Sequence, residues 1–251
     1  MRKNISYQIS LGLVLIVTAF FVANVRLKPA EWPISLFAIL AFSAPVFVGV
    51  KRWVGLRQSL VIISVLGVYA LVFETLSIKY GWPYGKFVYS ELLGPHLFSA
   101  VPFTVLVAWT PLVLGALAFS DSGTCSLGHS VWRTVKTVSL LVITDTVLDP
   151  AAVKLGFWHW LKQGTYYGVP AVNFFGWVLS GSIAVVAMRI YMHRKRIATP
   201  PILLGYNLLG IVGFWGLVNL FAGQLIPAAI SILLISYLVY ENRHINDIKM
   251  V

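Results

Sequence analysis

Charged residues are scarce in this sequence, and their scarcity excludes the surface of a water-soluble protein. Only 11% of the 251 residues are charged, 59% are hydrophobic, and the mean hydropathy is +0.84. A soluble domain usually carries about 25% charged residues. A chain with so few cannot cover itself with polar side chains, so we expect its solvent to be a lipid bilayer.

Cysteine is rarer still. The single Cys125 excludes an intramolecular disulfide and a cluster of thiolate metal ligands, and we interpret it as an inert thiol. Among the histidines, His96, His129 and His159 do not have the spacing that places two imidazoles on one helix face, so no metal site is indicated. Phosphate-cradling glycine loops, nucleotide fingerprints and serine nucleophile elbows are also missing. We therefore predict a protein without a metal or organic cofactor.

Acidic residues are few beside basic ones. Eight Asp and Glu face 19 Lys and Arg, for a formal net charge of +11. Such an excess can indicate nucleic-acid binding, but here the basic residues form short clusters between apolar runs, as the positive-inside rule describes. We interpret the basic run at 193–196 as a topology signal; a patch for nucleic acid or lipid headgroups is the weaker alternative. We expect no nucleic-acid partner.

Long apolar runs are what the sequence has in abundance. Crossing about 30 Å of hydrocarbon takes roughly 20 apolar residues in a helix, and open strand edges would leave backbone groups unpaired in lipid. The candidate spans are 5–25, 32–50, 58–78, 97–119, 134–153, 173–192, 201–222 and 224–240. Seven spans are the alternative, because only the segment Ala-Gly-Gln at 222–224 joins the last two runs, which would form a tight helical hairpin or one broken helix.

These runs predict an all-α protein, a polytopic transmembrane helical bundle. We expect residues 1–251 to form a single integral-membrane domain that crosses the cell membrane several times. The first run is too long for a signal peptide, is followed by Arg26 and Lys28, and lacks a clear cleavage site, so we expect it to be retained as a span. The sequence indicates no particular oligomeric state.

The basic residues also predict the orientation. With eight spans, 13 of the 19 Lys and Arg residues lie on the side of both termini and the other 6 on the opposite side. This difference places both termini in the cytoplasm. The connections 79–96 and 154–172 then share the non-cytoplasmic side, and both are dense in Trp, Tyr, Gly and Pro. An aromatic belt explains part of this composition, but the tight turns favour a structured lid over one mouth of the bundle.

Three acidic residues, Glu74, Asp145 and Asp149, lie within or at the edge of predicted spans. A carboxylate near mid-membrane costs on the order of 3 kcal/mol, so each is a functional candidate. Asp145 and Asp149 stand at positions i and i+4, on one helix face and about 6 Å apart along its axis. Two like charges so close resist joint ionisation, and a carboxyl that keeps its proton can act as a general acid.

Some of these residues have structural interpretations as well. Asp149 before Pro150 could be the N-cap of a new short helix, and Asn173 could cap the sixth span. Asp145 has no comparable structural reason near a helix C-terminus, where the macrodipole opposes it. Asp145 is therefore the preferred acid, and Glu74 could form a third wall of the same pocket.

In combination, the motifs of this region resemble those of the membrane carotenoid biosynthesis protein family, whose characterised members are carotenoid hydratases. The motifs span about residues 74–181 and are Trp82-Pro-Tyr-Gly85, Asp145-xxx-Asp149-Pro150, Gly156-x-Trp158-x-Trp160, Tyr166-Tyr-Gly-Val-Pro170 and Asn173-Phe-x-Gly-Trp177. The resemblance implies a hydratase that adds water, without a cofactor, to the terminal isopropylidene double bond of an acyclic carotenoid. The product is a tertiary alcohol, and the partners are the lipophilic substrate and the bilayer.

The resemblance also implies roles for individual residues. Asp145 would protonate the alkene, Asp149 would position the attacking water, and Glu74 is an alternative base. The residues expected to bind the substrate are Trp82, Tyr84, Trp158, Trp160, Tyr166, Tyr167 and Asn173.

The residues alone leave other functions open. Aspartates at this spacing could bind Mg²⁺ and diphosphate in a prenyl-transferring membrane enzyme, although such sites normally need more carboxylates and basic partners. Intramembrane carboxylates also relay protons in transporters, which internal repeats would favour, and the sequence shows no convincing repeat. A carotenoid-binding membrane protein without catalysis is the remaining alternative.

Overall fold

The computed structural model describes residues 2–121 and 131–249, and these ranges are mostly helical. Cys125 and His129 lie outside the described residues. The α-helices are α1 (Arg2–Asn24), α2 (Trp32–Tyr80), α3 (Val105–Asp121), α4 (Val131–Lys154), α5 (Ala171–Lys195), α6 (Ile202–Phe221) and α7 (Leu225–Lys249). Two short 3-10 helices, Pro29–Glu31 and Glu91–Leu93, lie in the connections. The predicted all-α class is confirmed.

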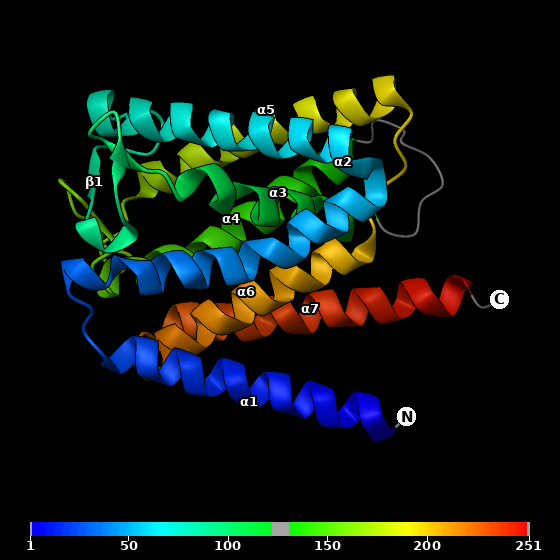
Figure 1. Cartoon of the computed structure of the whole chain (residues 1–251), viewed down its shortest axis with the longest axis horizontal. Coiled ribbons are helices and arrows are strands. Elements are labelled where there is room, and N and C mark those ends of the chain that lie inside the picture. The colour runs from blue at the N-terminus through cyan, green and yellow to red at the C-terminus, as the bar shows by residue number, and fades with distance from the viewer. Residues whose placement is uncertain (1, 122–130, 250–251) are drawn as a thin grey trace.

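The long helix α2 consists of two arms. Gly55 has φ 77° and ψ 167° and interrupts the helix, a conformation that glycine adopts without steric penalty. The first arm (residues 32–54) and the second arm (56–80) run in opposite directions and diverge from this bend, as Figure 1 shows. The described part of the chain contains seven α-helices. When the two arms of α2 are counted separately, they make eight helical segments, and one segment lies at each predicted span. The number of membrane crossings itself stays a prediction.

Length and hydropathy support membrane insertion for only some of these helices. Within the described residues, four helices are long and apolar enough to cross a membrane: Pro29–Tyr80, Ala171–Lys195, Ile202–Phe221 and Leu225–Asn242. Gly12–Asn24 and Val105–Asp121 are shorter apolar helices. Helix α4, which carries Asp145 and Asp149, belongs to neither group. It packs against α3, α5, α6 and α7, so protein covers much of its surface.

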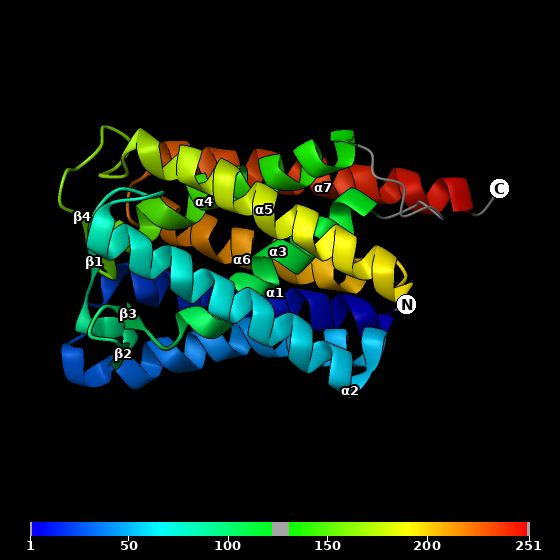
Figure 2. The same ribbon diagram turned by 90° about the horizontal axis from the view of Figure 1, so that it is seen from above.

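The helices alternate in direction. Both termini lie at one end of the bundle, which we call the terminal end, and the strands β1 and β4 lie at the other (Figures 1 and 2). Helices α6 and α7 form the predicted tight hairpin, joined through Gly223. Which end faces the cytoplasm stays a prediction.

The two aromatic connections meet at the end opposite the termini. Strand β1 (Phe87–Tyr89) pairs antiparallel with β4 (Trp158–Trp160), with Phe87 opposite Trp160 and Tyr89 opposite Trp158. We call residues 81–104 and 155–170 the lid. A second small ladder, β2 (His96–Leu97) with β3 (Val101–Pro102), occupies residues predicted to begin the fourth span. That span was placed too early, since α3 starts only at Val105.

Close backbone contact fastens the lid to the bundle. A Cβ atom on Gly176 of α5 would lie 2.8 Å from the carbonyl oxygen of Pro83 and 2.5 Å from Cδ1 of Tyr84. Only glycine therefore allows the turn at 82–85 to rest on α5. The Tyr84 hydroxyl donates to Ser180 Oγ on the same helix, at 2.8 Å. These contacts hold the lid against α5.

Candidate active site

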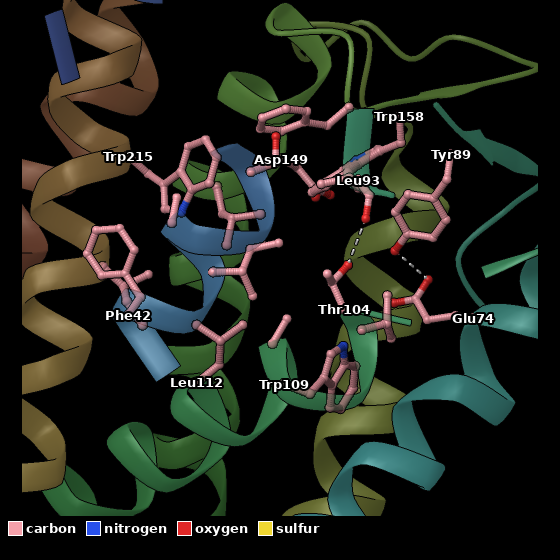
Figure 3. A pocket seen from close by; sticks show the side chains of 18 of the residues that line it. Phe42, Glu74, Tyr89, Leu93, Thr104, Trp109, Leu112, Asp149, Trp158 and Trp215 are labelled. Carbon is pink, nitrogen blue, oxygen red and sulfur yellow. Dashed lines mark hydrogen bonds between the residues drawn. The ribbon is translucent and has the colours of Figure 1, made fainter. Parts of the chain in front are cut away.

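A cavity of about 200 Å³ lies inside the bundle beneath the lid. Its wall is mostly aliphatic and aromatic, and the ionisable side chains in it are Glu74, Tyr84, Tyr89 and Asp149. Figure 3 shows Glu74 and Tyr89 on one side of the cavity and Phe42 and Trp215 on the other. The acidic part of this cavity is the candidate active site.

One amide joins the two aspartates. Asn173 Nδ2 on α5 donates to Asp145 Oδ2 at 2.8 Å and to Asp149 Oδ2 at 2.6 Å. The exposed fractions of Asp145, Asp149 and Asn173 are 2%, 5% and 2%. The predicted shared face is therefore confirmed, with two buried carboxyl groups bound to a single donor.

Two capping interpretations are wrong. Helix α4 continues through Pro150 to Lys154, so Asp149 does not cap a new helix. Pro170, with extended backbone, is the N-cap of α5, and Asn173 lies inside the helix with its side chain turned to the aspartates. Proline in the helix interior normally frees a carbonyl four residues earlier; here the Thr146 carbonyl accepts from the Tyr166 hydroxyl at 3.0 Å. A tertiary contact makes the continuous helix possible.

Glu74 reaches the cavity from the second arm of α2. Its side chain is buried, and Oε2 accepts a hydrogen bond from the Tyr89 hydroxyl at 3.2 Å. Burial and, after it, the Glu74 carboxyl raise the pKa of Tyr89 well above its ordinary value. Tyr89 therefore remains a hydrogen-bond donor to Glu74. The prediction that Glu74 shares a pocket with the aspartate pair is confirmed for Asp149.

Asp145 occupies a different position from Asp149. Asp149 and Asn173 line the cavity, whereas Asp145 is not part of its wall. Asp145 Oδ1 is buried and has no hydrogen-bond partner among the described residues. The preferred acid of the sequence prediction thus lies beside the cavity, next to the carboxyl that faces it.

The predicted substrate-binding residues divide into two groups. Tyr84, Trp158, Trp160 and Asn173 line the cavity. The others lie outside it: Trp82 is 51% exposed and packs on Phe73, Tyr166 supports the Pro150 segment, and the Tyr167 hydroxyl accepts from the backbone N–H of Ile226. The belt and packing interpretations therefore fit these three aromatic residues better.

Several cavity residues were not predicted. Trp109 and Trp177 stack with ring centroids 4.7 Å apart and an interplanar angle of 14°, and both line the cavity, as do Tyr89 and Trp215. Trp177 follows Asn173 by four residues, so helical spacing could have identified it. Trp109 comes from α3, and no local pattern links it to the acidic residues. In the described part of the chain, no three His, Cys, Asp or Glu side chains are grouped to hold a metal ion.

Comparison with known proteins agrees with the motifs of the site. Residues 31–238 match the family described as "Carotenoid biosynthesis protein". The chain belongs to this family. It is also 34% identical over 220 residues to bisanhydrobacterioruberin hydratase of Haloarcula japonica, and the alignment covers 85% of this chain and 74% of that protein. No solved structure matches the chain. The family match includes every carboxyl and aromatic residue described above.

Proposed function

We propose that this carotenoid biosynthesis family member is an integral-membrane carotenoid hydratase. The reaction is addition of water to the terminal isopropylidene double bond of an acyclic carotenoid, giving a tertiary alcohol. The observation that carries the proposal is the buried Asp145–Asn173–Asp149 group at the edge of an aromatic cavity, with Glu74 on another wall. The 34% identity to a named carotenoid hydratase supports the same reaction class.

Protonation comes first in the proposed mechanism. The two aspartate oxygens lie 2.8 and 2.6 Å from one nitrogen, so they are at most 5.4 Å apart, the sum of the two distances. Two negative charges at this separation in a buried site are unfavourable, and we infer that the pair retains one proton. Asp149 faces the cavity and transfers the proton to the less substituted alkene carbon, while Asp145 acts through Asp149. The proposal thus moves the role of acid from Asp145, where the sequence predicted it, to Asp149, and gives the orientation of the water to Glu74.

Water capture completes the reaction. Protonation leaves a tertiary carbocation, which the faces of Trp109, Trp158 and Trp177 stabilise through their π electrons. Glu74, held by Tyr89, orients a water molecule whose oxygen bonds to the cation. That oxygen then loses a proton, which returns to the Asp149 carboxylate and restores the acid. The sum is one alkene plus one water, so the scheme requires no redox cofactor.

The surroundings proposed for this site are those of a multi-pass cell-membrane protein. Eight spans with both termini in the cytoplasm would place the lid on the opposite side of the bilayer. The reacting end of a lipophilic substrate would then lie close to the interface, where water is available.

The test is a pigment assay in cells that make an acyclic carotenoid with isopropylidene ends. Expression of the wild-type chain should yield pigment heavier by one or two waters, and membranes incubated in heavy-oxygen water should place the label in the new hydroxyl group. Unchanged pigment with several acyclic carotenoids would contradict hydration. Unchanged pigment that co-purifies with the protein would instead indicate a carotenoid-binding protein.

A further inference from the structure

The cavity extends well beyond its carboxyl groups. From Glu74 and Asp149 it continues between the first arm of α2 and α6, where Phe42 and Phe214 line it with ring centroids 5.0 Å apart. Figure 3 shows this part on the side of Phe42 and Trp215, away from Glu74. Beyond these rings, Val22 and Leu27 form part of the wall. We call this region the apolar arm of the cavity.

One face of the first arm of α2 lines the apolar arm. The residues involved are Ile34, Ser35, Ala38, Ile39, Phe42 and Ser43, a repeat of three and four that places them on one helix face. The opposite face carries Phe37 and Ala44, which stand seven residues apart, are exposed and do not line the cavity. The same short helix therefore separates the cavity from the outer surface.

The apolar arm opens sideways between α1 and α2. Ile34 lines the cavity and is nevertheless 54% exposed, so it marks a place where the cavity reaches the surface. Helix α1 packs along α6 and makes little contact with α2, which leaves this seam without close helix packing. Phe21 and Val25, at and just after the end of α1, are exposed apolar residues. A ligand that arrives here comes from an apolar phase.

The dimensions indicate a long ligand held by one end. Pockets for drug-sized ligands measure roughly 300–1,000 Å³, so a cavity of about 200 Å³ encloses only the end of a carotenoid. We propose that the apolar arm is the binding channel for the polyene chain, which enters between α1 and the first arm of α2. The channel holds the chain while its terminal double bond reaches Asp149 and Glu74. This inference rests on the proposed function, and it adds the route and the residues that hold the chain.

A matched pair of substitutions tests the channel. Ala38→Phe adds a phenyl ring inside the apolar arm, and Ala44→Phe adds the same ring to the exposed face of the same helix. Because a lined cavity does not readily accept extra bulk, Ala38→Phe should lower the hydrated pigment per protein about tenfold or more. Ala44→Phe should match the wild type. Equal activity of both variants would overturn the channel.

A binding measurement separates this inference from the reaction. Each substitution is combined with Asp149→Asn, and the pigment that co-purifies with each protein in detergent is measured. The channel requires loss of pigment with Ala38→Phe and retention with Ala44→Phe, whether or not the wild type hydrates the pigment. Retention by both would overturn the channel even for an active hydratase, whereas no hydration by the wild type would contradict the proposed function alone. If Ala38→Phe does not accumulate, Ile34→Trp at the exposed opening replaces it with the same expected results.

Discussion

The two ends of the bundle treat buried carboxyl groups in opposite ways. Near the terminal end, Asp121 Oδ1 accepts from the Arg189 guanidinium at 2.8 Å, and Arg189 also donates to Thr137. Beneath the lid, no salt bridge to Glu74, Asp145 or Asp149 is found among the described residues. Their hydrogen-bond donors are neutral groups: the amide of Asn173, the hydroxyl of Tyr89, and the indole N–H groups of Trp109 and Trp158.

The proposed function gives this difference a meaning. A guanidinium carries a full positive charge, so it forms an ion pair with a buried carboxylate. Neutral donors satisfy a carboxyl oxygen without supplying a full opposite charge. The proposed function therefore assigns proton transfer to the carboxyl groups beneath the lid, whereas we expect the Asp121–Arg189 pair to stabilise the fold.

The largest effect on activity is expected at Asp149. Asp149→Asn keeps the side-chain shape but removes the transferable proton, so hydration should fall by about 10²–10⁴-fold, the range for loss of a general acid. The protein should still accumulate in membranes. Hydrated product per protein is the measurement, with Asp145→Asn as the comparison. If Asp145→Asn proved inactive and Asp149→Asn active, Asp145 would be the acid, as the sequence predicted.

The largest effect on stability is expected for the Asp121–Arg189 pair, near the terminal end of the bundle. Arg189→Met leaves Asp121 buried without its guanidinium, and breaking such a pair costs about 3–5 kcal/mol. The melting temperature in detergent and the amount of protein should fall, while product per folded molecule stays near the wild type. Adding Asp121→Leu should restore part of the stability. Loss of catalysis in a stable Arg189→Met protein would refute the structural role of this pair.

A smaller loss is expected at Asn173. Asn173→Ala leaves two buried carboxyl oxygens without their shared donor, at a cost of about 1–3 kcal/mol. Hydration should fall roughly ten- to a hundredfold, with accumulation in membranes little changed. Asn173→Asp, which has the same shape but adds a third carboxyl group, should be less active than Asn173→Ala. The reverse order would show that shape, rather than the amide donor, matters at this position.

For a substitution at Tyr89, we expect a few-fold loss of hydration activity, and we expect this loss to be the same at every pH. Tyr89→Phe removes one hydrogen bond to Glu74, worth about 0.5–1.5 kcal/mol. Because the pKa of Tyr89 is raised, its hydroxyl loses a proton only at a pH above the ordinary range for tyrosine. The pH–rate profiles of the wild type and Tyr89→Phe should therefore be parallel. An alkaline fall in activity that vanishes in the variant would assign that titration to Tyr89.

The smallest effect is expected at Trp82. This residue lies in the lid but outside the cavity, so Trp82→Leu should leave hydration within about twofold of the wild type. Trp158→Leu, which removes an aromatic wall of the cavity, should lower it clearly more. Equal losses in the two variants would show that the lid acts as a whole, independently of which aromatic residues reach the cavity.

The parts that could be predicted are those that depend on local spacing. The i, i+4 relation of Asp145 and Asp149 follows from helical geometry, and the turns of the lid follow from glycine and proline. Capping could not be judged locally. Asp149-Pro150 has the composition of a helix start, but Tyr166, far along the chain, satisfies the carbonyl that Pro150 frees. Asp121 was not identified from the sequence for a similar reason. It lies just beyond the predicted fourth span, and its partner, Arg189, is on α5.

The sequence by itself determined an all-helical, apolar protein of the carotenoid biosynthesis family with carboxyl groups near a lid. These properties arise from hydropathy, periodicity and motifs, which are read within a few residues of one another. Only the tertiary structure decided which carboxyl groups face the cavity, since this depends on how α2, α4 and α5 pack. The same packing bridges two aspartates with Asn173 and joins Asp121 to Arg189. Whether a buried acid is reactive or structural is thus decided by partners brought together from distant parts of the chain.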